Sequence, residues 1–182
     1  MATEGDGKQL FDAANTNDMV NLRLLINEWS GNDVINWPNP YIAGGDWCPS
    51  VKNVTPLIIA SIKGLAEIVR LLLDVPGIDV NKGDSDGWTP LHWASYKEHI
   101  EILRLLLDID VPGIDVNKAD KNGNTPLNWA IKNRRTKCVS LLIDIPSIDV
   151  NKANNDRWTP LDYARNNGPT ECVALLRAKG AK

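Results

Sequence analysis

Histidine and cysteine, the residues that most often carry catalysis or bind metals, are few and scattered in this chain. There are two histidines, His92 and His99, and three cysteines, Cys48, Cys138 and Cys172. No pair of them has the spacing of a zinc site, and three separated cysteines build no disulfide framework. The aspartates match no calcium loop, and no glycine pair leads into the Lys-Ser/Thr of a phosphate loop. We therefore expect no enzymatic activity, no metal and no cofactor.

The other chemistry that the sequence offers is recognition by large aromatic side chains. The chain has 7 tryptophans in 182 residues, and two of them, Trp88 and Trp158, each stand directly before a Thr-Pro pair. An exposed tryptophan is a common anchor of a protein interface, because it buries a large apolar area when a partner binds. The alternative is that each indole packs against a neighbouring loop.

The two tryptophans occur in register because the sequence is periodic. Thr-Pro-Leu recurs at intervals of 34, 36 and 34 residues, at 55–57, 89–91, 125–127 and 159–161. The octapeptide VPGIDVNK occurs at 75–82 and at 111–118, and 145–152 reads IPSIDVNK. The longer middle interval indicates an insertion at or beside 109–110. Such a period is typical of a solenoid, in which each unit buries its apolar face against the next.

Each unit is predicted to be a helix–turn–helix followed by a hairpin-like finger. In the second full copy, Thr89-Pro90 is a favourable start, with an N-cap and a proline at the first helical position. Apolar residues follow at helical spacing, a polar turn falls at 97–99, and a second apolar helix occupies 100–107. Pro112-Gly113 ends that helix, and Asn122-Gly123 is the turn signal of the next finger.

These units resemble the ankyrin repeat. The resemblance rests on Gly87-Trp88-Thr89-Pro90-Leu91-His92-Trp93-Ala94, the leucine run 105–107 and Val116-Asn117, and it covers nearly the whole chain. It implies an all-α solenoid of about five repeats, including caps, with β-hairpin-like fingers. It also implies that His92 is structural and braces a finger through hydrogen bonds. We expect a single domain over 1–182, comprising an N-terminal capping repeat (8–36), an inserted aromatic loop (37–54), repeats at 55–82, 83–118 and 119–152, and a C-terminal capping repeat (153–182).

The recurring asparagines of the octapeptide have two implied roles. By resemblance, the side-chain amides of Asn81, Asn117 and Asn151 satisfy backbone groups of the turn. Ankyrin proteins are also substrates of an asparaginyl hydroxylase at this position. Asn81 is the candidate for hydroxylation, because Leu73 lies eight residues before it, whereas the other two asparagines have isoleucine there.

Function is expected where the copies differ. In ankyrin proteins the residue before Thr-Pro lies on the finger, and the end of the first helix faces a concave groove. The residues two after the leucine of Thr-Pro-Leu form an aromatic row, which either fills space between first helices or contacts a partner. The candidate partner-binding residues are Trp88, Trp158, Tyr96, Lys132, Trp93, Trp129, Asn124, Trp37, Tyr41 and Trp47.

The last three of these candidates belong to the inserted loop at 37–54. A long loop in a compact domain is usually functional or disordered, and three aromatic residues argue against disorder. The loop is therefore either a lid over the first repeat joint or a protruding recognition loop.

Charge is distributed unevenly along the chain. Residues 1–118 contain 17 acidic and 9 basic residues, a net charge of −8, whereas residues 119–182 contain 6 acidic and 11 basic residues, a net charge of +5. The basic turn at 132–137 is either a solvated turn, a contact for an acidic or phosphorylated partner, or a nuclear-localisation patch. No basic stripe continues into the acidic half, so nucleic acid is not expected as the partner.

The sequence thus predicts a non-enzymatic protein–protein interaction module, a scaffold or adaptor that binds a partner protein through its groove and fingers. The alternatives are a reader of an acidic or phosphorylated ligand or of nucleic acid through the basic half, and the regulatory subunit of an enzyme. The chain has no membrane-length apolar run and no signal-peptide pattern at its start. We expect a cytoplasmic monomer, with the nucleus as an alternative location.

Overall fold

The computed structural model describes residues 4–28, 35–39, 52–108, 111 and 113–182. Contacts within the chain divide it into two compact units, Met1–Pro90 and Leu91–Lys182. The described residues form α-helices and turns with one isolated bridge, between Asn39 and Val54, and contain no β-strand. The predicted class, an all-α repeat solenoid, is therefore confirmed.

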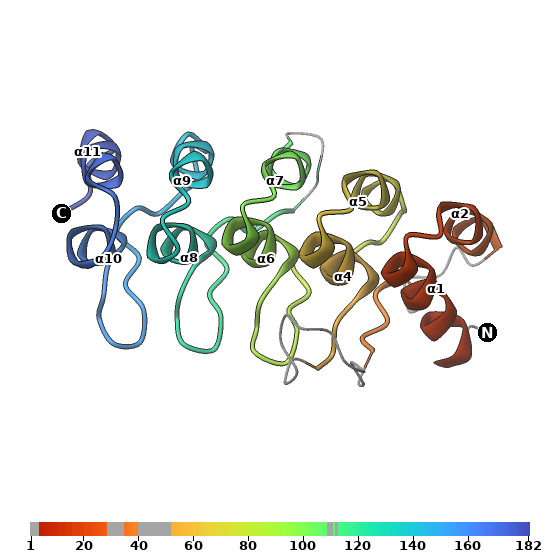
Figure 1. Cartoon of the computed structure of the whole chain (residues 1–182). Coiled ribbons are helices and arrows are strands. Elements are labelled where there is room, and N and C mark those ends of the chain that lie inside the picture. Colours follow the sequence, from red (N-terminus) through yellow and green to blue (C-terminus); the bar gives the residue numbers. More distant parts are fainter. Residues whose placement is uncertain (1–3, 29–34, 40–51, 109–110, 112) are drawn as a thin grey trace. The chain divides into compact units, whose positions relative to one another are not determined.

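The first unit is built from four described helices, α1 (Glu4–Thr16), α2 (Met19–Glu28), α4 (Pro56–Lys63) and α5 (Ala66–Leu73). Helix α1 packs against both α2 and α4, and α4 packs against α5 (Figure 1). The core of this unit comes from aliphatic residues such as Leu10, Leu22 and Leu57, whose side chains are at most 1% exposed. The finger at 83–89 leads from this unit to the next helix.

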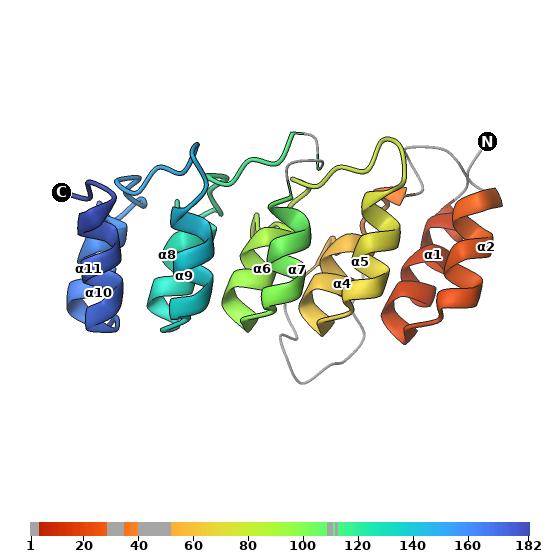
Figure 2. The ribbon, with the colours of Figure 1, turned by 90° about the horizontal axis from the view of Figure 1, so that it is seen from above.

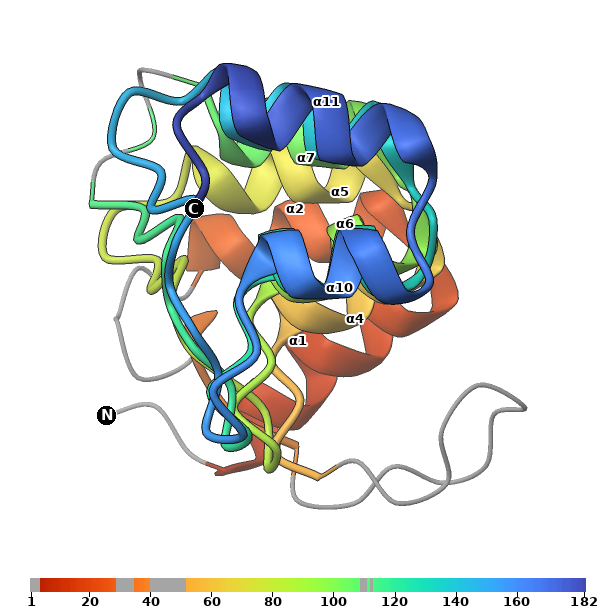
Figure 3. The same ribbon diagram turned by 90° about the vertical axis from the view of Figure 1, so that its left-hand side faces the viewer.

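The described residues of the second unit form six helices, α6 (Pro90–Lys97), α7 (Ile100–Leu106), α8 (Pro126–Lys132), α9 (Thr136–Ile143), α10 (Pro160–Asn166) and α11 (Thr170–Ala178). Helix α8 packs against α9 and α10, and α9 packs against α7 and α11. First helices and second helices therefore form two layers, and in the view from above in Figure 2 α9 overlies α8 and α11 overlies α10. Viewed along the stack, the fingers extend from the layer of first helices (Figure 3).

The first helices begin at the Thr-Pro pairs, as predicted. Thr55, Thr125 and Thr159 have extended backbones, and each hydroxyl oxygen accepts a hydrogen bond from the backbone N–H three residues later, at 3.2, 3.3 and 3.2 Å. At the last of these sites the Asp162 carboxylate also accepts from the Thr159 backbone N–H, which completes a capping box. An N-cap of this kind contributes about 1 kcal/mol to helix stability.

Asparagine side chains join successive repeats. In the first unit, the Asn36 amide donates to the Gly77 carbonyl oxygen at 2.8 Å and accepts from the Asp79 N–H at 2.7 Å. Asn117 repeats this pattern in the second unit, donating to the Ser147 carbonyl oxygen at 2.7 Å and accepting from the Asp149 N–H at 2.8 Å. The predicted structural role of Asn117 is confirmed. Its amide satisfies backbone groups of the following repeat rather than of its own turn.

Some predicted features lie outside the described residues. These are the insertion at 109–110 and two members of the aromatic loop, Tyr41 and Trp47. In the part of the chain that the structure describes, no helix has both the length and the apolar character needed to span a bilayer.

Candidate interaction site

Each finger is closed by a buried acidic or amide side chain at its base. Asp84, Asp120 and Asn154 are 7%, 6% and 7% exposed. The Oδ1 atom of each accepts hydrogen bonds from the backbone N–H groups two and four residues later, at 2.8–3.0 Å. The backbone N–H of each donates to the carbonyl oxygen four residues later at 2.9–3.0 Å. The residues four positions later are the predicted finger contacts Trp88, Asn124 and Trp158. Both the backbone N–H and the backbone carbonyl group of each are therefore fixed by hydrogen bonds.

The aromatic row on the first helices is tied to the fingers. The Trp129 indole N–H donates to Asp120 Oδ2 at 2.8 Å, and the corresponding Tyr163 hydroxyl accepts from Asn154 Nδ2 at 2.8 Å. The Tyr163 hydroxyl also donates to Asn124 Oδ1 at 2.9 Å, and Asn154 Nδ2 reaches that same oxygen at 3.1 Å. These bonds orient the rings and connect two neighbouring fingers.

His92 braces a finger, as the resemblance implied. Its side chain is fully buried, and Nε2 lies 3.1 Å from the carbonyl oxygen of Asn124. Because a carbonyl oxygen only accepts, we assign the proton to Nε2. Burial lowers the pKa of His92 to about 4, so the imidazole is neutral at physiological pH. A neutral, fully buried imidazole with a structural hydrogen bond is not placed to act on a substrate.

Three of the predicted contact residues form an edge-to-face aromatic chain. The Tyr96 ring lies between those of Trp93 and Trp129, with centroids 6.2 Å apart on each side and planes almost perpendicular. The Lys132 ammonium lies 4.6 Å from the centre of the Trp129 ring, within the range of a cation–π interaction. Trp93 is only 4% exposed and fills space, whereas Tyr96 and Trp129 are half-buried and present part of their surface.

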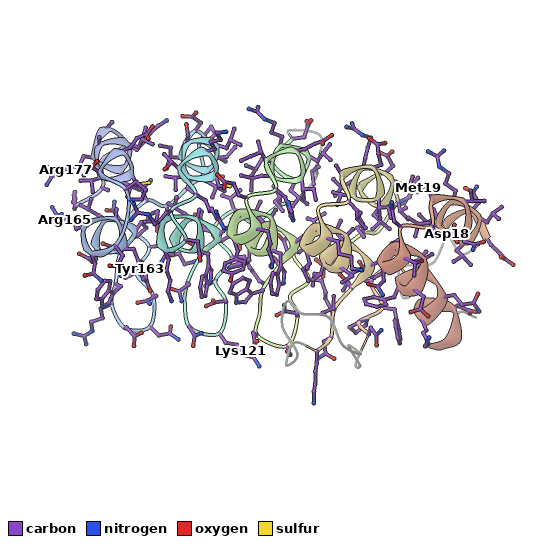
Figure 4. All side chains as sticks on the ribbon, viewed as in Figure 1. Asp18, Met19, Lys121, Tyr163, Arg165 and Arg177 are labelled. Atoms are coloured by element: carbon purple, nitrogen blue, oxygen red, sulfur yellow. The ribbon has the colours of Figure 1, made fainter. Side chains whose placement is uncertain are left out.

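Among the predicted aromatic contacts that the structure describes, Trp158 has the most exposed side chain. Its side chain is 38% exposed, and its ring packs on Tyr163 with centroids 5.3 Å apart. The indole forms a wall between two shallow depressions. One has a volume of about 210 Å³ and is lined by Lys132, Asp156, Trp158, Tyr163, Asn166 and Asn167. The other has a volume of about 310 Å³ and is lined by Asp156, Arg157, Trp158, Asp162 and Arg165. Figure 4 shows Tyr163 extending from α10 toward the finger.

Other predicted residues are less accessible or lie in the first unit. Asn124 is 5% exposed, and both its backbone and its amide oxygen are hydrogen-bonded, so we do not include it in the contact surface. Trp88 and Asn81 are half-buried in the first unit. Trp37 is also half-buried and packs where Gly7 leaves room on α1, since a Cβ atom on Gly7 would overlap its side chain.

The basic turn at 132–137 has a structural component. The Arg135 guanidinium donates to the Tyr96 carbonyl oxygen at 3.2 Å and forms an ion pair with Glu98 at 3.2 Å. Arg134 adopts a left-handed backbone conformation, with φ of 61°, and donates to the Asn167 carbonyl oxygen at 2.8 Å. Both arginines therefore link neighbouring repeats, and Arg134, Lys132 and Lys137 are exposed cations of this turn.

The described residues offer no arrangement for metal or thiol chemistry. Among them, no group of three or more histidine, cysteine, aspartate or glutamate side chains gathers as a metal site would require. Cys138 and Cys172 are buried free thiols. Burial raises the pKa of Cys138 to about 12 and also raises the pKa of Cys172, so neither is a thiolate at neutral pH.

Comparison with known proteins identifies the family. The family model for ankyrin repeats (three copies) matches residues 10–120 and 109–182. The chain belongs to the ankyrin-repeat family. Ankyrin repeats are generally protein–protein interaction modules.

Individual ankyrin relatives match only part of the chain. Protein phosphatase 1 regulatory subunit 12A of Mus musculus is 46% identical over 54 residues, 30% of this chain and 5% of that protein. Alpha-latrocrustotoxin-Lt1a of Latrodectus tredecimguttatus is 36% identical over 64 residues, 35% of this chain and 4% of that protein. SMC5-SMC6 complex localization factor protein 1 of Mus musculus is 40% identical over 58 residues, 32% of this chain and 6% of that protein. The chain thus spans a small fraction of the length of these relatives.

Several residues of the site were not among the sequence predictions. Asp120 and Asn154 position the fingers, and Arg157 and Arg165 border the second depression beside Trp158. A signal for the first pair was present in the sequence. An Asp or Asn stands four residues before each full-finger contact and nine residues before each aromatic residue of the row.

Proposed function

We propose that this ankyrin-repeat domain is a non-enzymatic interaction module, and that the second unit binds a partner protein through its first helices and fingers. The observation that carries the proposal is the setting of Trp158. Its backbone N–H and carbonyl groups are both hydrogen-bonded to Asn154, yet its side chain is 38% exposed. Of the three equivalent positions, one holds Trp88 and the other two hold Val54 and Asn124, which are buried, so the repeat itself does not require a tryptophan there.

The neighbouring side chains extend the proposed contact surface. The Tyr163 ring packs against the indole of Trp158, and Lys132 lines the smaller depression together with both aromatic residues. Tyr96 and Trp129 continue the aromatic surface along the first helices. A rigid aromatic cluster of this kind loses little conformational freedom on binding, and truncating such an anchor typically costs about 2 kcal/mol or more.

Trp88 is proposed as a contact of the first unit. It occupies the same finger position, and its backbone N–H and carbonyl groups are held by Asp84 as those of Trp158 are held by Asn154. Its effect on binding is best measured separately from that of Trp158, because the two residues belong to different units.

The test compares proteins captured from cell extract by the full chain and by two variants. Trp158→Ala removes the proposed anchor. Leu24→Ala is a matched control, since Leu24 is a 59% exposed apolar residue on α2. We expect the wild type and the control to capture the specific partner equally, and Trp158→Ala to capture about tenfold less of it or lower still. Equal capture by all three proteins would show that Trp158 is not the anchor.

A second candidate follows from the name of one relative, a regulatory subunit of protein phosphatase 1. Under this candidate the bound partner is an enzyme, and the domain alters its activity. The likeness covers 5% of that relative's length, so it supports the idea of a regulated enzyme without naming one. Assaying any captured enzyme with the wild type and with Trp158→Ala would decide this candidate. If the domain is a regulator, the wild type changes the activity of the captured enzyme and Trp158→Ala changes it less.

A further inference from the structure

We infer that the partner segment bound at Trp158 is acidic, with one apolar side chain placed in the 210 Å³ depression and carboxylates directed at the bases around it. This inference rests on the proposed function and specifies the chemistry of the partner. The inference is based on three features: the volume of the depression, the basic side chains that line it and its neighbour, and the balance of basic and acidic charges around Trp158.

The depression has the size of a side-chain site rather than a small-molecule site. Its volume of about 210 Å³ lies below the roughly 300–1,000 Å³ typical of ligand pockets. Two of its walls are aromatic, the indole of Trp158 and the ring of Tyr163. An apolar side chain from an extended segment would cover surface of both rings, which is the usual way in which one anchor residue is recognised.

Basic side chains stand on both sides of Trp158. Lys132 lines the smaller depression, and Arg157 and Arg165 line the larger one. All three are exposed. In the described part of the chain the structure shows no ion pair at 4 Å or less for any of these three bases. Arg165 nevertheless lies near Asp162, whose pKa is lowered by hydrogen bonds from Thr159 and further by this arginine.

The acidic groups at the site do not cancel this positive charge. The two acids that line the depressions are Asp156 and Asp162. The Asp162 carboxylate is committed to the helix cap, where its Oδ2 atom accepts from the Thr159 backbone N–H at 2.9 Å and from its hydroxyl at 2.7 Å. These hydrogen bonds lower the pKa of Asp162, so its carboxylate keeps its negative charge. Asp156 and Asp162 thus carry two negative charges against the three positive charges of the bases, which leaves the site with a net charge of +1. At physiological ionic strength charges act over about 8 Å, so carboxylates beside the anchor would be attracted.

The same observations favour an acidic protein segment over nucleic acid. A nucleic-acid surface needs a track of cations that follows the phosphates. Such a track is interrupted beside this site, because Arg135 is paired with Glu98 and the carboxylates of Asp156 and Asp162 lie among the bases. The remaining bases surround an apolar anchor site, which suits a peptide with one apolar residue between carboxylates.

The experiment selects ligands from a random peptide library displayed on phage, using the full chain as bait. Peptides retained by the wild type are screened again on Trp158→Ala and on the control Leu24→Ala. We expect the Trp158-dependent peptides to share an apolar residue flanked by Asp or Glu. One selected peptide is then synthesised with its acids intact and with each Asp or Glu changed to Asn or Gln. The neutral version should bind about tenfold more weakly, and the difference should shrink as salt is raised.

Charge reversal on the protein provides a matched pair. Arg165→Glu changes a base at the site, and Arg177→Glu changes an exposed base on α11 (Figure 4). We expect Arg165→Glu to weaken the acidic peptide by about threefold to fivefold, and Arg177→Glu to leave its affinity unchanged.

The outcomes separate the inference from the proposed function. Trp158-dependent peptides that are neutral or basic would overturn the inference and leave the proposed function standing. A selection that yields no Trp158-dependent peptide would overturn both. A labelled single-stranded oligonucleotide is tested as the alternative ligand. If it displaces the peptide and binds more tightly than the peptide in a Trp158-dependent way, the ligand is nucleic acid and the inference is overturned.

Discussion

Replacing Asn117 by alanine should weaken the joint between two repeats of the second unit. The change removes two hydrogen bonds, one to the Ser147 carbonyl oxygen at 2.7 Å and one from the Asp149 N–H at 2.8 Å. Each such bond contributes about 1 kcal/mol net. Ser147 and Asp149 are exposed, so water partly replaces the amide, and we expect a loss of about 1.5 kcal/mol. For a chain of this length that corresponds to a decrease in Tm of about 3–6 °C.

Asn151 supplies the matched control for this prediction. It occupies the same position in the next octapeptide, but the structure gives its amide one hydrogen bond, accepted from the Lys182 N–H at 2.9 Å. Asn151→Ala should therefore cost about half as much as Asn117→Ala. Urea unfolding followed by both tryptophan fluorescence and circular dichroism measures the two losses and shows whether the probes coincide. An equal or larger loss for Asn151→Ala would refute the attribution to the two hydrogen bonds.

Three further predictions concern stability and modification. The pKa of His92 is lowered from 6.5 to about 4, so the stability it confers is complete above about pH 6.5 and falls by roughly 3 kcal/mol as the pH drops to 4. In His92→Asn, the free energy of unfolding measured with urea should depend less on pH between 6.5 and 4. The same pH dependence as in the wild type would show that His92 does not cause the loss of stability. Changing Thr125-Pro126 to Ala-Gly should lower the Tm through loss of an N-cap contributing about 1 kcal/mol, while partner affinity measured below that Tm stays the same. If Asn81 is the hydroxylated residue, co-incubation with an asparaginyl hydroxylase should add one oxygen to the peptide that contains it, and an unmodified peptide would end that idea.

The fold could be predicted because its determinants are local and repeated. Each Thr-Pro pair stands at the start of a helix, and Thr55, Thr125 and Thr159 cap theirs through a hydrogen bond from the residue three positions later. The structural role of His92 was also predictable, because it depends on the repeat motif rather than on a unique environment.

The accessibility of the candidate site residues could not be predicted in the same way. Asn124 and Trp158 share one position in the repeat, but Asn124 is 5% exposed and Trp158 is 38% exposed. The difference arises because the Asn124 amide bonds to groups of the next repeat, Asn154 and Tyr163, which sequence spacing alone does not bring together. Side-chain contacts between repeats depend on how the repeats pack against each other, and the sequence pattern within one repeat does not specify that packing.

The most direct test of Trp158 as the partner anchor measures one affinity and one stability on the same protein. The affinity of the captured partner, or of a selected peptide, is determined for the wild type and for Trp158→Ala by titration calorimetry, alongside thermal unfolding of both. We predict an affinity about tenfold or more lower at a temperature at which both proteins are folded, with a moderate fall in Tm because the indole also packs on Tyr163. A large fall in Tm with unchanged affinity would contradict it, and would place Trp158 in the packing of the repeat.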